Sequence, residues 1–316
     1  MRNHFLPQLD RTFLTDAGLE TDMIFNRGVD LPGFSAITLL RTTDGIEALK
    51  DYFRPYLALA ARVGAGFILE SASWRASPDW AEPLALSVDQ LDGLNLASIQ
   101  LLHALREEFA GKGAPIIVSG CIGPRGDGYV PGQIMTLAEA EAYHSHQAAV
   151  LASASPDMLS AFTINNVNEA IGVTRAAART GLPFALSFTV ETDGRLPGGD
   201  ALCAAIGAVD AATDGYPAYY MINCAHPAHF ADMLAEGGAW VSRIRGIRAN
   251  ASRCSHAELE AMTELDVGDP ADLGARYCDL RGLHPQLTVL GGCCGTDLRH
   301  VEAIANACLR PAMQAA

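Results

Sequence analysis

The sequence predicts an α/β protein, a (β/α)8 TIM barrel folded as one domain over residues 1–316. Short apolar segments alternate with longer segments that carry charges at helical spacing. Eight such pairs follow one another, the number that closes a parallel barrel. With 49% hydrophobic and 18% charged residues, the chain has the composition of a globular protein with a sizeable core.

The expected strands are continuous apolar runs bounded by Gly, Pro or polar residues. This pattern is typical of strands that are buried on both faces of a parallel sheet. The predicted strands cover residues 13–18, 66–71, 115–122, 158–163, 183–189, 219–224, 246–251 and 287–292.

The expected helices are rich in Ala and Leu. They cover residues 44–63, 87–109, 136–154, 166–180 and 297–309, with further helices after Phe230 and at 256–261. Thr136 and Glu139 form a capping-box pattern at one helix start. Gly181 followed by Pro183 is a helix stop signal, because Gly accepts the left-handed conformation and Pro cannot continue a helix.

A doubly wound open sheet is the competing fold. It would use fewer strands and would usually place a glycine-rich nucleotide loop after the first strand. Here the first strand runs into Asp16-Ala-Gly-Leu-Glu-Thr21, which lacks that form. Because no linker or low-complexity segment interrupts the pattern, we expect one barrel domain.

The net charge of the chain limits the kinds of partner that it is suited to bind. Lys plus Arg number 22 and Asp plus Glu number 36, which gives a net charge of −14. An acidic protein is poorly suited to nucleic acid or to anionic membranes, so we expect neither as a partner. The N-terminal residues show no signal-peptide pattern, and we expect a cytoplasmic protein with reduced cysteines. The oligomeric state is not predicted.

Three cysteines fall where barrel enzymes carry their chemistry, at the carboxyl ends of strands. Cys224 ends the sixth expected strand, and Cys293 and Cys294 end the eighth within Gly291-Gly-Cys-Cys-Gly295. Three thiolates can fill three corners of a tetrahedron around Zn²⁺ and leave the fourth open, as in catalytic zinc sites. The sequence therefore predicts a zinc site in which these cysteines are both metal ligands and catalytic residues.

Three thiolates on Zn²⁺ give a net charge of about −1, which makes a weak Lewis acid toward carbonyls. Such a centre suits another task. A small thiol that takes the fourth position loses its proton and becomes a soft nucleophile at neutral pH, where a free thiol is mostly protonated. We expect this thiolate to accept a methyl group.

The other cysteines and nearby histidines have simpler interpretations. Cys203, Cys278 and Cys308 lie in expected helices and are interpreted as packing residues. Cys121 and Cys254 follow strands and are interpreted as bystanders, although either could line a pocket. His226 and His229 follow Cys224, and we expect a lid or supporting role for them rather than zinc ligation. A redox pair of adjacent cysteines is disfavoured because their disulfide would be strained.

From about Phe13 to about Leu309 the chain resembles the homocysteine S-methyltransferase family. Asn223-Cys224 together with Gly291-Gly-Cys-Cys-Gly295 are the specific motifs, and further support comes from residues 16–21, 70–76, 119–124 and 187–190. The resemblance implies a (β/α)8 barrel, a zinc site of three cysteines, and methyl transfer to homocysteine that yields methionine.

The resemblance also implies substrate-binding residues. Asp16 corresponds to the acid that holds the substrate amine, and Ala17 replaces a Gly whose amide helps to seat the carboxylate. Ser71 corresponds to a hydroxyl near that carboxylate, and Trp74 to an aromatic pocket wall. Asn223 is expected to orient the first zinc ligand or the substrate.

One residue departs from the family. Phe162 stands where the family has a Glu that is a second partner for the substrate amine. Losing one charge-assisted hydrogen bond costs about 1.5–3 kcal/mol. Either Glu191 or Glu70 compensates, or the acceptor is not homocysteine. The alternative function is thus the same scaffold acting on another thiol, or removing a methyl group from a methylated sulfur or nitrogen compound.

The methyl donor is the second substrate. With no second domain to carry a corrinoid or a folate, the resemblance favours a sulfonium donor, S-methylmethionine or S-adenosylmethionine, or a betaine-type donor. Catalysis would then rest on thiolate activation and in-line positioning. A non-catalytic zinc-storage barrel is the remaining alternative, and it requires that the thiol pocket be closed.

Overall fold

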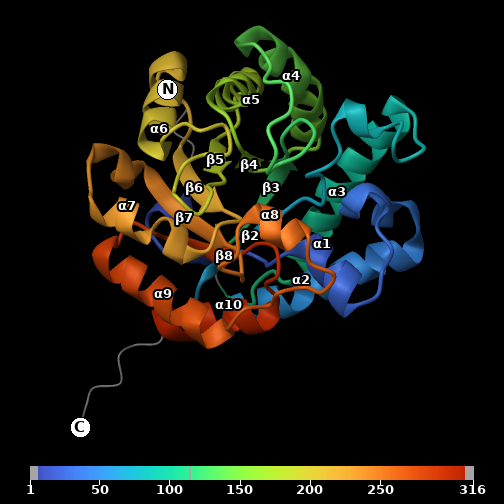
Figure 1. Cartoon of the computed structure of the whole chain (residues 1–316). Coiled ribbons are helices and arrows are strands. Elements are labelled where there is room, and N and C mark those ends of the chain that lie inside the picture. Colours follow the sequence, from blue (N-terminus) through green and yellow to red (C-terminus); the bar gives the residue numbers. More distant parts are fainter. Residues whose placement is uncertain (1–5, 114, 310–316) are drawn as a thin grey trace.

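The computed structural model describes residues 6–113 and 115–309. Its strands form a closed parallel barrel in the order β1 to β8, with β1 paired to β8, so the predicted (β/α)8 fold is confirmed (Figure 1). That the domain takes in every residue from 1 to 316 stays a prediction. The strands are β1 (Phe13–Leu14), β2 (Gly66–Glu70), β3 (Ile116–Ile122), β4 (Met158–Ile164), β5 (Phe184–Phe188), β6 (Tyr219–Asn223), β7 (Ile244–Ala249) and β8 (Val289–Gly292).

Helices surround the barrel on the outside (Figure 1). The short α1 follows β1 and α2 leads to β2, while α7 and α8 are short helices after β6 and β7. The helices are α1 (Leu19–Thr21), α2 (Thr43–Val63), α3 (Val88–Glu108), α4 (Leu137–Ser153), α5 (Val167–Thr180), α6 (Leu202–Thr213), α7 (Ala231–Ala235), α8 (His256–Glu260), α9 (Pro270–Leu283) and α10 (Leu298–Leu309). The helices expected around Cys203 and Cys278 are α6 and α9.

The first strand is shorter than predicted. Only Phe13–Leu14 is paired on both sides, whereas the prediction extended to Gly18. Beyond Leu14 the chain bonds to β8 alone, through the Thr15 amide to Leu290 O at 2.9 Å and the Gly292 amide to Asp16 O at 2.9 Å. The chain then bends at Gly18 into α1.

Local signals in the sequence set the helix ends. Thr136 accepts a hydrogen bond from the Glu139 amide, and the Glu139 carboxylate accepts one from the Thr136 amide, which is the predicted capping box. Gly181 has φ of 72° and ends α5, as its position before Pro183 predicted. The six bounded helix predictions agree with α2, α3, α4, α5, α8 and α10 to within one residue at each end.

The interior of the barrel is packed at its amino end. Phe13, Ile117, Met158, Tyr219 and Val289 are all buried there and contact one another. A second apolar layer lies between the strands and the surrounding helices. Because side chains fill the amino end, the barrel opens at the carboxyl ends of its strands, where such folds carry their sites.

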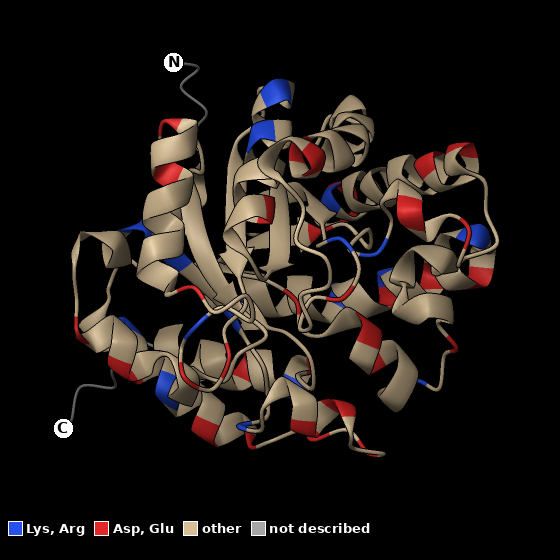
Figure 2. Cartoon of the chain, turned by 45° about the horizontal axis from the view of Figure 1, so that its top comes forward, with Lys and Arg blue, Asp and Glu red and all other residues tan. Residues whose placement is uncertain are grey.

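The surface is acidic. Figure 2 shows Asp and Glu spread over the outer helices, with Lys and Arg scattered among them. Within residues 6–113 and 115–309, the structure has no helix long and apolar enough to cross a bilayer. The absence of nucleic-acid and membrane partners and the cytoplasmic location stay predictions.

Candidate metal centre

The three predicted cysteines meet at the carboxyl ends of β6 and β8. The sulfurs of Cys224, Cys293 and Cys294 lie within 4.8 Å of one another, and those of Cys224 and Cys293 are 2.8 Å apart. Metal ligands in proteins are mostly His, Cys, Asp and Glu side chains. Among the described residues, this is the one place where three or more such side chains bring their ligand atoms close enough to share a metal ion. All eight cysteines are free thiols.

Backbone strain positions Cys224. Its φ is 54°, a left-handed value that residues with a side chain rarely adopt, and Thr163 near the end of β4, two strands away, has φ of 62°. Asn223 joins the two. Its Oδ1 accepts from the Thr163 amide at 2.9 Å, and its Nδ2 donates to Thr163 Oγ1 at 2.9 Å and lies 3.8 Å from Cys293 Sγ. Strain of this kind persists only where surrounding bonds enforce it, and it concentrates at functional sites.

The turn that carries Cys293 and Cys294 depends on its glycines. A side chain at Gly291 or Gly292 would collide with the hydroxyl of Thr15 or Thr296. Buried Tyr277 on α9 then fixes the strand end, because its hydroxyl accepts from the Ala249 amide at 2.8 Å and donates to Gly291 O at 2.6 Å.

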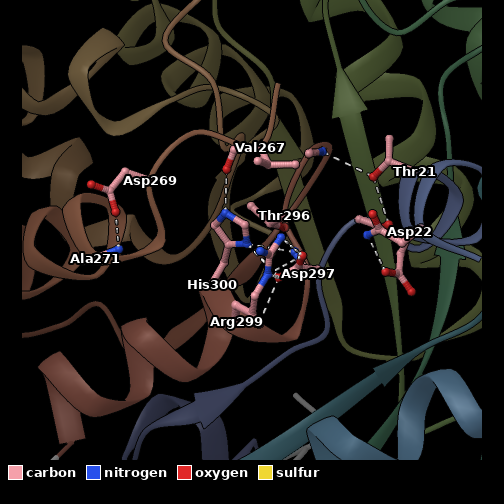
Figure 3. Close-up of polar contacts among 12 residues, drawn as sticks. Thr21, Asp22, Val267, Asp269, Ala271, Thr296, Asp297, Arg299 and His300 are labelled. Carbon is pink, nitrogen blue, oxygen red and sulfur yellow. Dashed lines mark hydrogen bonds and ion pairs between the residues drawn. The ribbon is translucent and has the colours of Figure 1, made fainter. Parts of the chain in front are cut away.

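Polar contacts hold the far side of this turn (Figure 3). The Gly295 amide donates to Thr21 Oγ1, and His300 connects the start of α10 to Val267 O at 2.7 Å. Burial alone would raise the pKa of Asp297, but hydrogen bonds from His300 and Arg299 outweigh it and hold that pKa well below its usual range. The cysteine turn is therefore anchored to both α1 and α10.

The chemistry of the sulfur cluster fits a cation. Burial raises the pKa of Cys224, whereas hydrogen bonds from Cys224 and Cys294 hold the pKa of Cys293 well below its usual range. Ionisation of more than one of these neighbouring sulfurs would bring like charges together. A divalent metal removes this conflict, since each thiolate becomes a ligand. The three sulfurs match the ligand set of a catalytic zinc site with one position open.

Sequence reasoning missed two residues beside the cluster. The hydroxyl of Tyr129, in the loop between β3 and α4, lies 2.9 Å from Cys224 Sγ and 3.6 Å from Cys294 Sγ. Its ring packs on that of His256, with centroids 4.3 Å apart. His256 in turn bonds Cys224 O at 2.7 Å and the Glu191 carboxylate at 3.1 Å.

A cavity opens next to the cysteines, with a volume of about 640 Å³ that includes its open mouth. Eight of the ten predicted site residues line it, namely Asp16, Ala17, Ser71, Trp74, Phe162, Asn223, Cys293 and Cys294. Cys224 is fully buried behind them. Cys121 also lines the cavity, and its interpretation as a bystander stays a prediction.

Glu191 is not brought to the cavity. The chain turns sharply after β5, where the Glu191 amide bonds to Arg195 O, and the side chain pairs with His256 instead. Glu191 therefore cannot replace the Glu that the family has at the position of Phe162. His226 and His229 likewise lie outside the sulfur group, and their rings bond to backbone atoms of Ala228 and Arg253.

Asp16 has a partner within the chain. Its Oδ1 accepts from Arg248 Nη2 at 2.9 Å and its Oδ2 from the Tyr52 hydroxyl at 3.0 Å. Burial raises the pKa of Asp16, and the charge of Arg248 acts in the opposite direction. The guanidinium also lies 5.1 Å from the centroid of the Phe162 ring, so Arg248 stands between the two residues expected to define the amine site.

Three acidic or polar residues complete the cavity wall. Ser71 Oγ accepts a hydrogen bond from the Cys121 amide. The Ser73 hydroxyl donates to Cys121 O, so in the bond between the two serines it is Ser71 that donates. The single hydroxyl proton of Ser71 is therefore already used. Glu70 is buried and accepts from Ser160 Oγ at 2.6 Å. Glu20 also lines the cavity, and burial raises its pKa to about 7.

A closed (β/α)8 barrel with three thiols at metal-binding distance at the carboxyl ends of its strands defines a class of barrel protein with a metal-competent sulfur site. The chain belongs to the homocysteine S-methyltransferase family, whose model matches residues 13–308. It is therefore a methyltransferase, as the sequence predicted.

Similar proteins agree with this assignment. Homocysteine S-methyltransferase 4 of Zea mays is 26% identical over 261 residues, 76% of this chain and 75% of that protein. Homocysteine S-methyltransferase 3 of Zea mays is 25% identical over 321 residues, 92% and 88% of the two chains. The homocysteine methyltransferase MmuM from Escherichia coli, in its oxidized form, has a TM-score of 0.73 at 21% identity, covering 96% of this chain and 98% of that one. Its metallated form has a TM-score of 0.70 at 19% identity, covering 94% and 96%. These structures support the fold.

Proposed function

We propose that this protein transfers a methyl group from a cationic donor to the thiol of homocysteine, giving methionine, with Zn²⁺ held by Cys224, Cys293 and Cys294. The observation that carries the proposal is the meeting of three sulfurs within 4.8 Å beside an open cavity. The names of the relatives, and the existence of MmuM in a metallated form, support the acceptor and the metal.

The chain's own residues prepare the acceptor side. Zinc in this ligand set would supply a centre that keeps the acceptor thiol deprotonated at neutral pH. Asn223 fixes Cys293 and the strained backbone before Cys224, so the ligands are held before any substrate arrives. The Tyr129 hydroxyl lies 2.9 Å from Cys224 Sγ, so a thiol that approaches Cys224 would displace it.

The donor side suits a positively charged methyl compound. The rings of Phe34, Trp74 and Tyr129 line the cavity, and aromatic faces attract sulfonium and quaternary ammonium groups. Glu20 adds a carboxylate to the cavity wall, and within residues 6–113 and 115–309 it forms no ion pair with a basic side chain. A sulfonium such as S-methylmethionine or S-adenosylmethionine, or a betaine-type donor, therefore finds complementary charge beside the thiol.

A second candidate function rests on Phe162. Its ring lies in the cavity wall and beneath Arg248, and the pocket has no acid at this place. The same scaffold would then act on another thiol, or remove a methyl group from a methylated sulfur or nitrogen compound. A panel of thiols assayed with the wild-type enzyme and with Phe162→Glu separates the two functions, because homocysteine as the best wild-type acceptor excludes the altered-acceptor alternative.

Mutation of a cysteine tests the main proposal. Cys294→Ala should lose most bound zinc and nearly all methyl transfer, because two thiolates remain where three are needed. Cys203→Ala, which changes an exposed cysteine on α6, is the matched control and should keep both. Full zinc content and full activity in Cys294→Ala, or activity in a zinc-free preparation, would refute the proposal.

A further inference from the structure

Arg248 is a buried cation with one nitrogen still available. It lies on β7 and is 8% exposed, and its side chain lines the cavity. Nε donates to Gly292 O at 3.0 Å, and Nη2 donates to Asp16 Oδ1 at 2.9 Å and to Ala17 O at 3.0 Å. Nη1 makes no hydrogen bond to any described residue and remains accessible to solvent. Three fixed acceptors thus hold the guanidinium with Nη1 facing the cavity.

The available nitrogen is also close to the sulfurs. Gly292, which accepts from Nε, directly precedes Cys293 in the chain. A thiol bound at the cysteine cluster therefore places its carbon chain beside this guanidinium. An anionic group a few bonds from the sulfur is the ligand that a preset guanidinium recognises best.

Other donors in the cavity are neutral, such as the hydroxyls of Thr163 and Tyr129. Among the residues that line it, Arg248 alone carries a positive charge. The Ser71 hydroxyl, expected near a substrate carboxylate, uses its proton on Ser73. The Ala17 amide makes no hydrogen bond within the described chain and can add one neutral donor.

The same guanidinium fills the place expected for a substrate ammonium. Asp16, the expected amine partner, is already bonded to Arg248, and Phe162 presents a ring to Arg248 in place of a second acid. A substrate ammonium at this place would be repelled by the positive charge of Arg248. The place between Asp16 and Phe162 thus provides for a carboxylate, and an α-amino group would have to reach Glu20 or Glu70, the other carboxylates of the lining.

We propose that Arg248 binds the carboxylate of the acceptor through Nη1, and that the acceptor is a small thiol carboxylic acid for which the α-amino group is dispensable. This inference rests on the proposed thiol chemistry of the cysteine centre and names the substrate class that the centre accepts. Homocysteine belongs to that class, and so does the same molecule without its amine.

Two analogues of homocysteine test the inference on the wild-type, zinc-loaded protein. 4-Mercaptobutanoate lacks the amine, and 3-mercaptopropylamine lacks the carboxylate, while both keep the same thiol and chain length. Calorimetric titration should show 4-mercaptobutanoate binding within about tenfold of homocysteine. It should bind about tenfold to a hundredfold tighter than 3-mercaptopropylamine, the factor that one charge-assisted hydrogen bond provides. A preference of less than about tenfold, or the reverse order, overturns the inference.

A variant locates the effect at Arg248. Arg248→Lys keeps the charge opposite Asp16 but removes the second arm of the guanidinium. It should weaken 4-mercaptobutanoate binding by about tenfold or more and leave 3-mercaptopropylamine within about twofold of wild type. Arg245→Lys, on the same strand but outside the cavity lining, should change neither. Equal weakening of both thiols would show a general structural effect and overturn the assignment.

Different results would refute the proposed function and the proposed role of Arg248. If no thiol, homocysteine included, binds to the zinc-loaded protein or accepts a methyl group, the proposed function itself is wrong. If homocysteine binds and is methylated but the amine analogue binds as well as the acid analogue, only the role of Arg248 is wrong.

Discussion

Asn223 offers a direct test of how the cysteine centre is held. The side chain is 1% exposed, and Asn223→Ala removes all of its hydrogen bonds at once. The Thr163 amide and the Ser187 hydroxyl, now bonded to Asn223 Oδ1 at 2.9 and 2.6 Å, would then be buried without a partner. At about 1–3 kcal/mol for each group, the free energy of unfolding should fall by about 2–6 kcal/mol.

The same substitution should weaken zinc binding. Asn223 Nδ2 lies 3.8 Å from Cys293 Sγ, and its bonds to Thr163 hold the strand end from which Cys224 projects. Residues that orient metal ligands typically account for about tenfold to a hundredfold in metal affinity. Urea unfolding measures the first effect, and competition with a chromogenic chelator measures the second.

Ser187→Ala is the matched control for this experiment. It removes one bond to the same Oδ1 but no group near a sulfur. It should cost about 1 kcal/mol of stability and leave zinc affinity within about threefold of wild type. The reasoning fails if Asn223→Ala unfolds within about 0.5 kcal/mol of wild type, or if Ser187→Ala loses as much zinc affinity as Asn223→Ala.

Three further predictions follow from buried or cavity-lining groups. Tyr277→Phe should lower the free energy of unfolding by about 2–4 kcal/mol in a urea titration, because two buried hydrogen bonds are lost, and an unchanged midpoint would contradict this. Tyr129→Phe should tighten thiol binding by up to about tenfold in calorimetry, because the entering sulfur no longer displaces a hydroxyl 2.9 Å from Cys224 Sγ, and weaker binding would argue against displacement. Burial raises the pKa of Glu20 to about 7, so its carboxylate is charged above that pH and protonated below it. The Kd of a cationic donor should therefore improve from pH 6 to pH 8 in wild type and stay flat in Glu20→Gln, and the same slope in both proteins would exclude Glu20 as the donor partner.

The barrel could be predicted from the sequence because its signals are local. Continuous apolar runs mark strands that are buried on both faces, and caps such as Thr136 with Glu139 mark the helix starts. The cysteine centre followed from the fold, since all strand ends of a parallel barrel point to one rim. Adjacent cysteines after a glycine pair were then sufficient to single out the sulfurs that meet there.

The remainder of the site depends on contacts that no local pattern reports. Arg248 meets Asp16 across 232 positions of sequence, and an arginine within a strand gives no sign of which face it occupies. Tyr129 reaches the sulfurs from a Gly- and Pro-rich loop whose path the sequence does not determine. Glu191 failed as a site residue for the related reason that a tight turn after β5 directs its side chain to His256.

Interpreting all three helical cysteines as packing residues was also wrong in part. Cys203 and Cys278 are exposed, on the outer faces of α6 and α9, whereas Cys308 is partly buried. Cysteine is usually buried, but an amphipathic helix buries only the stripe that faces the barrel. Residue type alone therefore does not assign a face.

Zinc-edge X-ray absorption of the purified protein, recorded with and without homocysteine, tests the central claim most directly. The account predicts about one zinc per chain with three sulfur ligands at rest and four after the thiol is added. A preparation without zinc, or a sulfur count that stays at three with saturating homocysteine, would contradict the claim that the cysteine centre activates a thiol.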